Sequence, residues 1–413
     1  MTRLVDDMHT HSGDTMTRKP EQTHITAPTQ TPTQTPTQTP WQAQRRQALS
    51  ALPALAALPA MLLSACGGGG SPSNASNEDP NKLRAPTGTG TGGGSTPNPT
   101  GSTPVGNAPV YANLRGASLG VGASLNGAIP FPADNPWNTD ISGMPVDPNS
   151  ANLIASIGVG TGLHPDFGAG LYNGAPIGIP YLVVSGSEAR LPINYTAYGD
   201  ESDPGPFPVP VNAPIEGGSQ STGDRHVLVI DRDNNRLYEI GNAYPQANAW
   251  DASGGALFHL DSNTVRPGGQ PGWTSADAAG LPIFPGLARY DEAMLGAGGI
   301  RHALRFTAVR TRRAYVPPAT HYASSNTSVN VPPMGMRVRL KASYQIPASF
   351  STETKALLQA MKTYGLILAD NGSNWFISGA PDDRWNNDRL LTELRQVTGS
   401  QFEVVRMDGL VTG

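Results

Sequence analysis

The chain has 413 residues, a formal net charge of −4 and only 15% charged residues. It has no basic stripe, and its aromatic residues do not interleave with Lys or Arg, so nucleic acid is not expected as a partner. The single cysteine excludes a disulfide framework.

The first 65 residues read as a leader with a lipoprotein signal. Arg45 and Arg46 form a positive segment, and residues 48–64 form an apolar run too short and too proline-interrupted to span a membrane stably. The run ends in Leu-Ser-Ala before Cys66, which resembles the lipidation site of bacterial lipoproteins. We predict a lipid anchor on Cys66, and the glycine after it favours the outer membrane by the same resemblance. Twin-arginine export and an unprocessed amphipathic N-terminus are the alternatives.

Residues 66–110 are rich in Gly, Ser, Thr and Pro and have few apolar residues to bury. This composition predicts a disordered tether. With roughly 40 residues and an end-to-end distance of about 5–6 Å × √n, it would hold a folded domain about 35 Å from the membrane.

Residues 111–335 predict a mainly β domain, a sandwich or jelly roll, because short apolar runs alternate with Gly- and Pro-rich turns. The clearest element is a hairpin of residues 225–231 and 236–240 around an Asp/Asn turn. Both faces of its first strand are apolar, so we expect a central strand. Further strands are expected at 178–184, 257–260, 303–308 and 337–341.

Helices are expected to be few before residue 336. Residues 274–277 suit the start of a short helix, and residues 287–295 another. Residues 336–413 predict an α+β portion packed on the main domain. It should contain helices at 352–364 and 388–396, a hairpin of 366–369 and 375–378 around Asn371-Gly372, and a last strand at 402–406. The order β-α-β-β-α-β also allows a separate ferredoxin-like unit, but extension of the main sheet is preferred because no linker precedes residue 336.

Histidines in apolar strand-like segments are the first candidates for chemistry, with His226 and His302 foremost. In a lyase, either could abstract the proton next to a uronate carboxyl while Arg289 or Arg305 neutralises the developing charge. The alternative is that each is a core histidine bonded to a backbone carbonyl.

Carboxylates are the second candidates, because glycosidases use a pair of them across the scissile bond. Asp224, Glu239, Asp277 and Asp291 would supply the acid and base of a hydrolase. Glu239 interrupts an apolar strand, so it should either reach solvent or line a cleft and bind substrate.

No metal site or other cofactor is expected, with a metal site assembled from distant strands as the alternative. The histidines lack metal-ligand spacing and no second cysteine is present. Asp261, Asp277 and Glu216 could offer oxygens to Ca²⁺, but no segment has the alternating carboxylates of a calcium loop.

Tryptophans near predicted loops are candidates for stacking on sugar rings. Trp273 and Trp385 are the two expected to bind substrate, with Arg305 as a further contact. Ordinary packing of loops onto the sandwich is the alternative.

Several segments resemble a family of largely uncharacterised secreted proteins of actinobacteria and proteobacteria. They are WNTDIS, SDPGP, GDRHVLV, WTSADAAGLPI, RYDE, HALRFT and RWNN, spread over roughly residues 129–405. The resemblance implies one intact secreted domain and implies no activity, substrate or catalytic residue.

Together these features predict a surface-anchored lipoprotein that acts on extracellular polysaccharide, as a glycoside hydrolase or a polysaccharide lyase. Its catalytic residues would come from Asp224, His226, Asp277, Arg289, Asp291 and His302. The rival hypothesis is a lipoprotein without catalysis that binds glycan or scaffolds the envelope.

Overall fold

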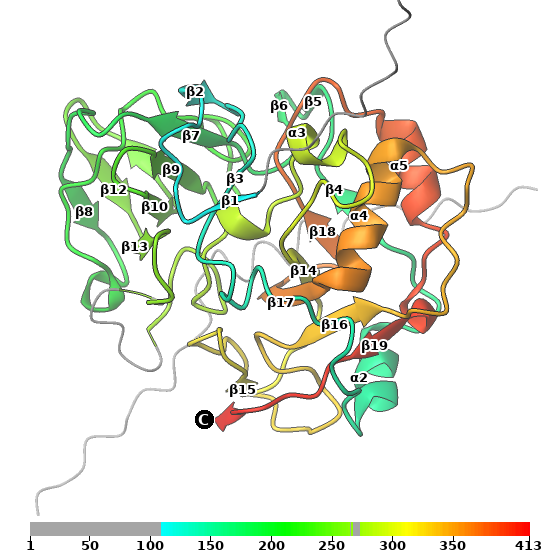
Figure 1. Ribbon diagram of the computed structural model, residues 1–413. Coiled ribbons are helices and arrows are strands. Elements are labelled where there is room, and N and C mark those ends of the chain that lie inside the picture. The colour runs from blue at the N-terminus through cyan, green and yellow to red at the C-terminus, as the bar shows by residue number, and fades with distance from the viewer. Residues whose placement is uncertain (1–108, 265, 267–272) are drawn as a thin grey trace, which may run out of the picture.

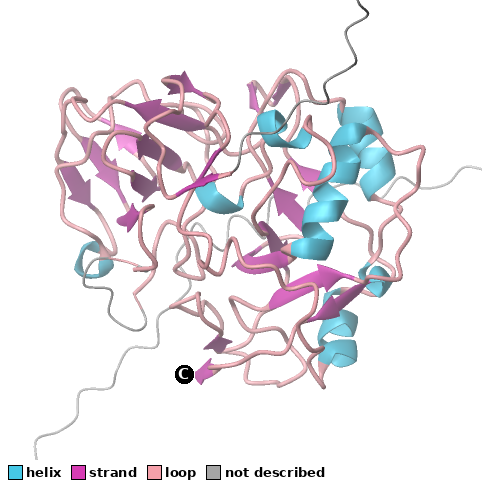
Figure 2. Cartoon of the chain, viewed as in Figure 1, coloured by secondary structure: helices cyan, strands magenta, loops and turns pink. Residues whose placement is uncertain are grey.

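The computed structural model describes residues 109–264, 266 and 273–413. The expected leader, Cys66 and nearly all of the expected tether lie outside these residues. The described part is mainly β, as predicted, with two large sheets side by side and few helices (Figures 1 and 2). Among its helices, none has the length and apolarity needed to cross a bilayer.

The first sheet has five strands in the order β13-β10-β9-β7-β2. Its strands are β2 (Gly120–Val121), β7 (Tyr181–Val184), β9 (Val227–Asp231), β10 (Arg236–Gly241) and β13 (Gly254–His259). The predicted hairpin is confirmed as β9 and β10, which pair antiparallel. Its turn is held by the Asp231 carboxylate, which accepts from the Asn234 backbone and side-chain nitrogens at 3.1 and 2.8 Å.

Strand β9 is central because each of its faces packs into a different apolar cluster. Val227 and Val229 pack with Trp250 of a small sheet, whereas Leu228 and Ile230 join the larger core shared with the rest of the molecule. That small sheet has the order β11-β12-β8, with bounds Tyr244–Pro245, Trp250–Ala252 and Ile193–Tyr195.

The second sheet has six strands in the order β19-β16-β17-β14-β18-β4. Its strands are β4 (His164–Asp166), β14 (Leu304–Ala308), β16 (Arg337–Leu340), β17 (Leu366–Asn371), β18 (Phe376–Ser378) and β19 (Phe402–Val404). Strands from both sides of residue 336 therefore share one sheet, so the ferredoxin-like alternative is wrong. The β9–β10 hairpin belongs to the first sheet, so the C-terminal strands do not extend the sheet that contains it.

The expected hairpin of 366–369 with 375–378 is also wrong in its pairing. Both strands form, but β14 lies between them, parallel to β17 and antiparallel to β18. Strand β14 is buried along its whole length and occupies the centre of the sheet. The connection crosses its end, where the Gly372 N–H donates to the Ala308 carbonyl at 3.1 Å.

The helices are α2 (Ser150–Ile157), α3 (Tyr290–Ala293), α4 (Thr352–Thr363) and α5 (Asn387–Leu394), with short 3₁₀ turns at Gly199–Glu201, Phe284–Gly286 and Gly399–Gln401. Helices α4 and α5 lie on the side of the second sheet away from the first (Figure 1). The Ser351 hydroxyl caps α4 by accepting from the Thr354 N–H, and Gly365 follows its end with φ of 74°.

One expected helix does not form, and another is much shorter than expected. Residues 274–277 form turns instead, because the Ser275 hydroxyl and the Asp277 carboxylate accept from backbone N–H groups two residues ahead. Of residues 287–295, only Tyr290–Ala293 is helical. The extended backbone at Arg289 and the left-handed Gly296 limit the helix on its two sides.

The remaining strands of the described residues form three short two-stranded pairs. They are β1 (Val110–Tyr111) with β3 (Ala128–Ile129), β5 (Leu171–Tyr172) with β6 (Ala175–Pro176), and β15 (Ala314–Tyr315) with β20 (Val411–Thr412).

Candidate functional site

A cavity of about 610 Å³ lies between the loop that precedes β9 and one face of the second sheet. The β5–β6 hairpin forms part of its rim. Its charged lining residues are Asp166, Glu216, Asp224, His226, Arg305 and Asp370. The volume is within the range of small-ligand sites.

The sheet wall of the cavity is a row of polar side chains across four neighbouring strands. Ser378 of β18 pairs with Asp166 of β4, and Thr307 of β14 pairs with Asp370 of β17. Arg305 lies two residues before Thr307, on the same face of β14, and donates to the Ser378 hydroxyl at 3.1 Å. The alternate residues of β14 and β18 are apolar and buried in the core, so β14 presents one polar and one apolar face.

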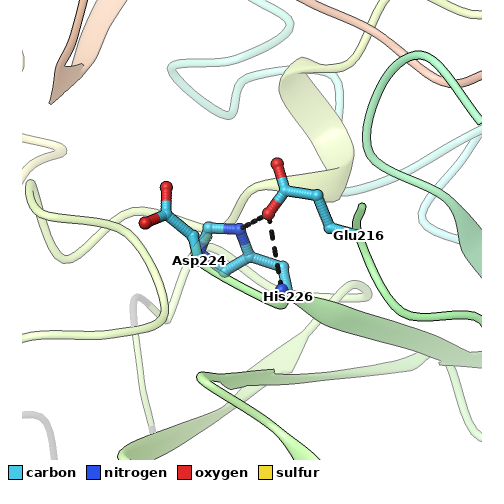
Figure 3. Close-up of side chains that lie close together, drawn as sticks. All are labelled: Glu216, Asp224 and His226. Carbon is cyan, nitrogen blue, oxygen red and sulfur yellow. Dashed lines mark hydrogen bonds and ion pairs between the residues drawn. The ribbon is translucent and has the colours of Figure 1, made fainter. Parts of the chain in front are cut away.

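The loop wall is residues 216–226, closed at its base by the Glu216 N–H, which donates to the His226 carbonyl at 2.9 Å. Arg225 is 2% exposed and donates to carbonyls within the loop and to the Ala243 carbonyl, all at about 2.9 Å. Its φ of 51° is in the left-handed region. Arg225 thus holds the loop from inside, while the Asp224, His226 and Glu216 side chains gather in one place (Figure 3).

His226 is the most constrained of these side chains. Its Nδ1 lies 2.6 Å from Glu216 Oε2, and its Nε2 lies 2.8 Å from the Ala276 carbonyl oxygen. Burial alone lowers the pKa of His226, but the Glu216 carboxylate, Asp224 and the Ala276 carbonyl together outweigh burial and the pKa rises to about 9. With an acceptor at each ring nitrogen, His226 is an imidazolium at neutral pH.

Asp277 lies behind the sheet wall and fixes Arg305. It is 1% exposed, and it accepts from the Arg305 guanidinium at 2.5 Å and from the Ala279 N–H at 2.8 Å. Burial raises the pKa of Asp277 to about 6, although Arg305 opposes the shift. Because residue 276 bonds to His226 and Asp277 bonds to Arg305, this short segment joins the two walls of the cavity.

Three other expected catalytic residues, Arg289, Asp291 and His302, lie outside the cavity lining. Glu292 accepts from Arg289 and lies 3.0 Å from His302 Nε2, which makes a second buried polar network. The Arg289 guanidinium also lies over the Phe284 ring, at 5.0 Å from its centroid. Asp291 accepts from the Ser124 hydroxyl at 2.9 Å instead. The cavity therefore brings together Asp224, His226 and Arg305 but not Arg289, Asp291 or His302.

Glu239 neither reaches solvent nor lines the cavity, contrary to expectation. It is fully buried, and its oxygens accept from the Ile283 and Phe284 N–H groups at 2.9 Å. Burial raises the pKa of Glu239 to about 7. Its side chain ties β10 to the 3₁₀ turn that follows Ile283, so its position indicates a structural role.

The two expected sugar-stacking tryptophans differ in their surroundings. Trp385 is 4% exposed, donates to the Ala380 carbonyl at 3.2 Å and packs edge-on against Phe167 and Tyr290. It is a core residue, and stacking on substrate would require it to leave that core. Trp273 is partly exposed but lies beside Arg266, away from the cavity lining.

Sequence reasoning missed three carboxylates of the cavity as catalytic candidates: Asp166, Glu216 and Asp370. Asp370 had a usable signal, since it interrupts an apolar strand directly before the Asn371-Gly372 turn. Asp166 and Glu216 stand in Gly- and Pro-rich segments with no periodic pattern, so only the tertiary structure places them together.

Comparison with protein-family models, with curated proteins and with solved structures found no match to this chain. The resemblance drawn from the seven segments therefore stays a prediction.

Proposed function

We propose that the chain is an envelope-anchored lipoprotein that hydrolyses an extracellular polysaccharide, with the cavity between the loop and the second sheet as its active centre. The observation that supports this most is the presence of carboxylates on both walls of one cavity. Glu216 and Asp224 stand on the loop wall, and Asp166 and Asp370 on the sheet wall.

Glycoside hydrolysis needs an acid and a base or nucleophile on two sides of the scissile bond. Its transition state is positively charged, like an oxocarbenium ion. Among the described residues of the lining, four carboxylates face two cationic groups, His226 and Arg305. A lining of net negative charge stabilises such a transition state.

The lyase alternative fits these contacts less well, although His226 and Arg305 both line the cavity. Both ring nitrogens of His226 already face acceptors, and Arg305 is paired with Asp277. A net negative lining also repels the uronate carboxylate that a lyase must bind.

The anchor is part of the proposal. A lipid on Cys66 and residues 66–110 as a tether would place this cavity outside the cell, within reach of insoluble polymer. The outer membrane is the proposed location, and no cofactor is required by the hydrolytic chemistry itself.

The test is a panel of neutral and acidic polysaccharides incubated with the full chain, purified in detergent. Both new reducing ends and the ultraviolet absorbance of unsaturated uronates are followed. Hydrolysis gives reducing ends alone, whereas the appearance of unsaturated uronates would overturn hydrolysis in favour of β-elimination. Retention on a polymer with no turnover would instead support the binding lipoprotein.

Two variants localise the activity. Glu216→Gln on the loop wall and Asp370→Asn on the sheet wall should each lower the rate about 10²- to 10⁴-fold, the usual contribution of an acid–base group. Asp388→Asn, an exposed carboxylate on α5, is the matched control and should keep the full rate.

A further inference from the structure

We infer that Glu216, Asp224 and His226 form a binding site for one divalent transition-metal ion. Each residue offers one ligand atom, and these atoms all lie within 4.8 Å of one another (Figure 3). No other group of three such side chains occurs among the residues that the structure describes. The inference concerns binding alone. An ion held here would take Glu216 as a ligand, so the metal-bound form and the acid–base role proposed for Glu216 are alternative states of the same site.

The orientation of the His226 ring is the first argument. Histidines that bind metals through one nitrogen almost always donate the other N–H to a carbonyl or carboxylate, which fixes the ring. Here Nε2 bonds to the Ala276 carbonyl oxygen, and Nδ1 is turned toward Glu216. His226 is 5% exposed, so this orientation is held by burial as well.

The fixed position of the ligands is the second argument. Glu216 and His226 are joined at the base of the loop by a backbone hydrogen bond of 2.9 Å. Asp224 is docked by the Asn242 N–H, which donates to its carbonyl at 2.8 Å. The buried Arg225 guanidinium holds the loop between them. A site with ligands held in this way loses little conformational entropy on binding.

Charge is the third argument. Two carboxylates and a neutral imidazole carry two negative charges, which match a divalent cation. In the structure His226 Nδ1 lies 2.6 Å from Glu216 Oε2. Two ligand atoms of a tetrahedral ion with bonds of about 2.1 Å stand roughly 3.4 Å apart, so the two side chains would separate by about 0.8 Å to admit the ion.

The ligand set points to the kind of ion. Imidazole with carboxylates suits Zn²⁺ and Mn²⁺ better than Ca²⁺, which prefers six to eight oxygen ligands. Three protein ligands leave coordination positions that face the cavity, as in sites that bind water or substrate. A sugar hydroxyl or a water molecule is therefore the expected fourth ligand.

Binding is tested on the untagged full chain, treated with chelator and titrated with ZnCl₂ and with MnCl₂ by calorimetry. The spectrum of bound Mn²⁺ is recorded in parallel by electron paramagnetic resonance. The expected stoichiometry is one ion per chain. Asp224→Asn leaves the pair of Glu216 and His226 intact and should weaken binding at least about tenfold. Loss of a residue that only hydrogen-bonds a metal ligand already lowers affinity by about that factor, and loss of a ligand should lower it no less.

Asp388→Asn is the control and should bind like the wild type. Circular dichroism establishes that each variant is folded, and Glu216→Gln provides a second test of the same site. Absence of binding to the wild type, or equal affinity in wild type, Asp224→Asn and Glu216→Gln, would overturn the inference. Neither result involves substrate, so a failure here and a failure of the hydrolysis proposal are separate outcomes.

Discussion

Substitution of Glu239 by glutamine should shift the stability difference between the variant and the wild type in favour of the variant as pH rises. The pKa of Glu239 is raised from 4.5 to about 7 by burial. Between these values the folded state keeps a proton that the unfolded state has lost, so the stability of the wild type falls as pH rises from about 4.5 to 7. At about 1.36 kcal/mol per pKa unit, this fall is about 3 kcal/mol.

A glutamine side chain is close in shape to a protonated glutamate. Its amide oxygen can still accept from the Ile283 and Phe284 N–H groups, as Oε1 of Glu239 does now at 2.9 Å. Since glutamine does not ionise, the stability difference between the Glu239→Gln variant and the wild type should move by about 3 kcal/mol in favour of the variant from about pH 5 to about pH 8.

The assay is urea unfolding followed by circular dichroism at closely spaced pH values. Glu188→Gln, in the turn after β7, is the control for loss of one carboxylate from the chain. If the Glu239→Gln difference is flat with pH, or moves against the variant as pH rises, the reasoning about burial is wrong.

Three other predictions each concern a single side chain and its contacts. Glu216→Gln should lower the pKa of His226 from about 9, because Glu216 is the main group that raises it. NMR titration of the ring protons measures this pKa, and an unchanged value would contradict the role given to Glu216. In the wild type this pair stabilises the fold below about pH 6.5, and its contribution is lost as pH rises through about 9. Trp385→Ala should cost about 3–5 kcal/mol of unfolding free energy, as for buried aromatic residues, whereas a sugar-stacking role predicts little loss of stability and loss of glycan retention. Arg225→Lys should reduce both stability, by about 1–3 kcal/mol, and activity, because a lysine cannot reproduce the fork of hydrogen bonds to the loop carbonyls; unchanged unfolding in urea would show that the loop does not depend on it.

Local patterns in the sequence were sufficient for the elements whose stability is local. The β9–β10 hairpin follows from two apolar runs around an Asp/Asn turn, and the end of α4 follows from the glycine at position 365. The same reasoning failed at residues 274–277, where the Ser275 and Asp277 side chains satisfy nearby N–H groups in turns and so compete with a helix.

Pairing between distant strands was out of reach of local patterns. Insertion of β14 between β17 and β18 depends on which apolar strand is most completely buried, and that is decided by the whole core. The adjacent sequence of β17 and β18, with a strong turn signal, instead favours a direct hairpin.

The candidate site was predicted only in part, because it too depends on contacts between distant segments. Asp224, His226 and Arg305 were expected and do line one cavity, whereas Arg289 and His302 were expected and form a separate network around Glu292. A buried polar residue in an apolar strand indicates that it belongs to a polar network, but the sequence does not show which network. Glu216 reaches His226 only because the loop closes on itself at its base.

The most direct test of the account is the initial rate of reducing-end release from the best polymer of the panel. It compares the wild type with Glu216→Gln, Asp370→Asn and the control Asp388→Asn. The account predicts a rate for the wild type and the control, and a loss of about 10²-fold or more in both cavity variants. No release by the wild type on any polymer, or full rates in both cavity variants, would contradict the placement of a hydrolytic centre in this cavity.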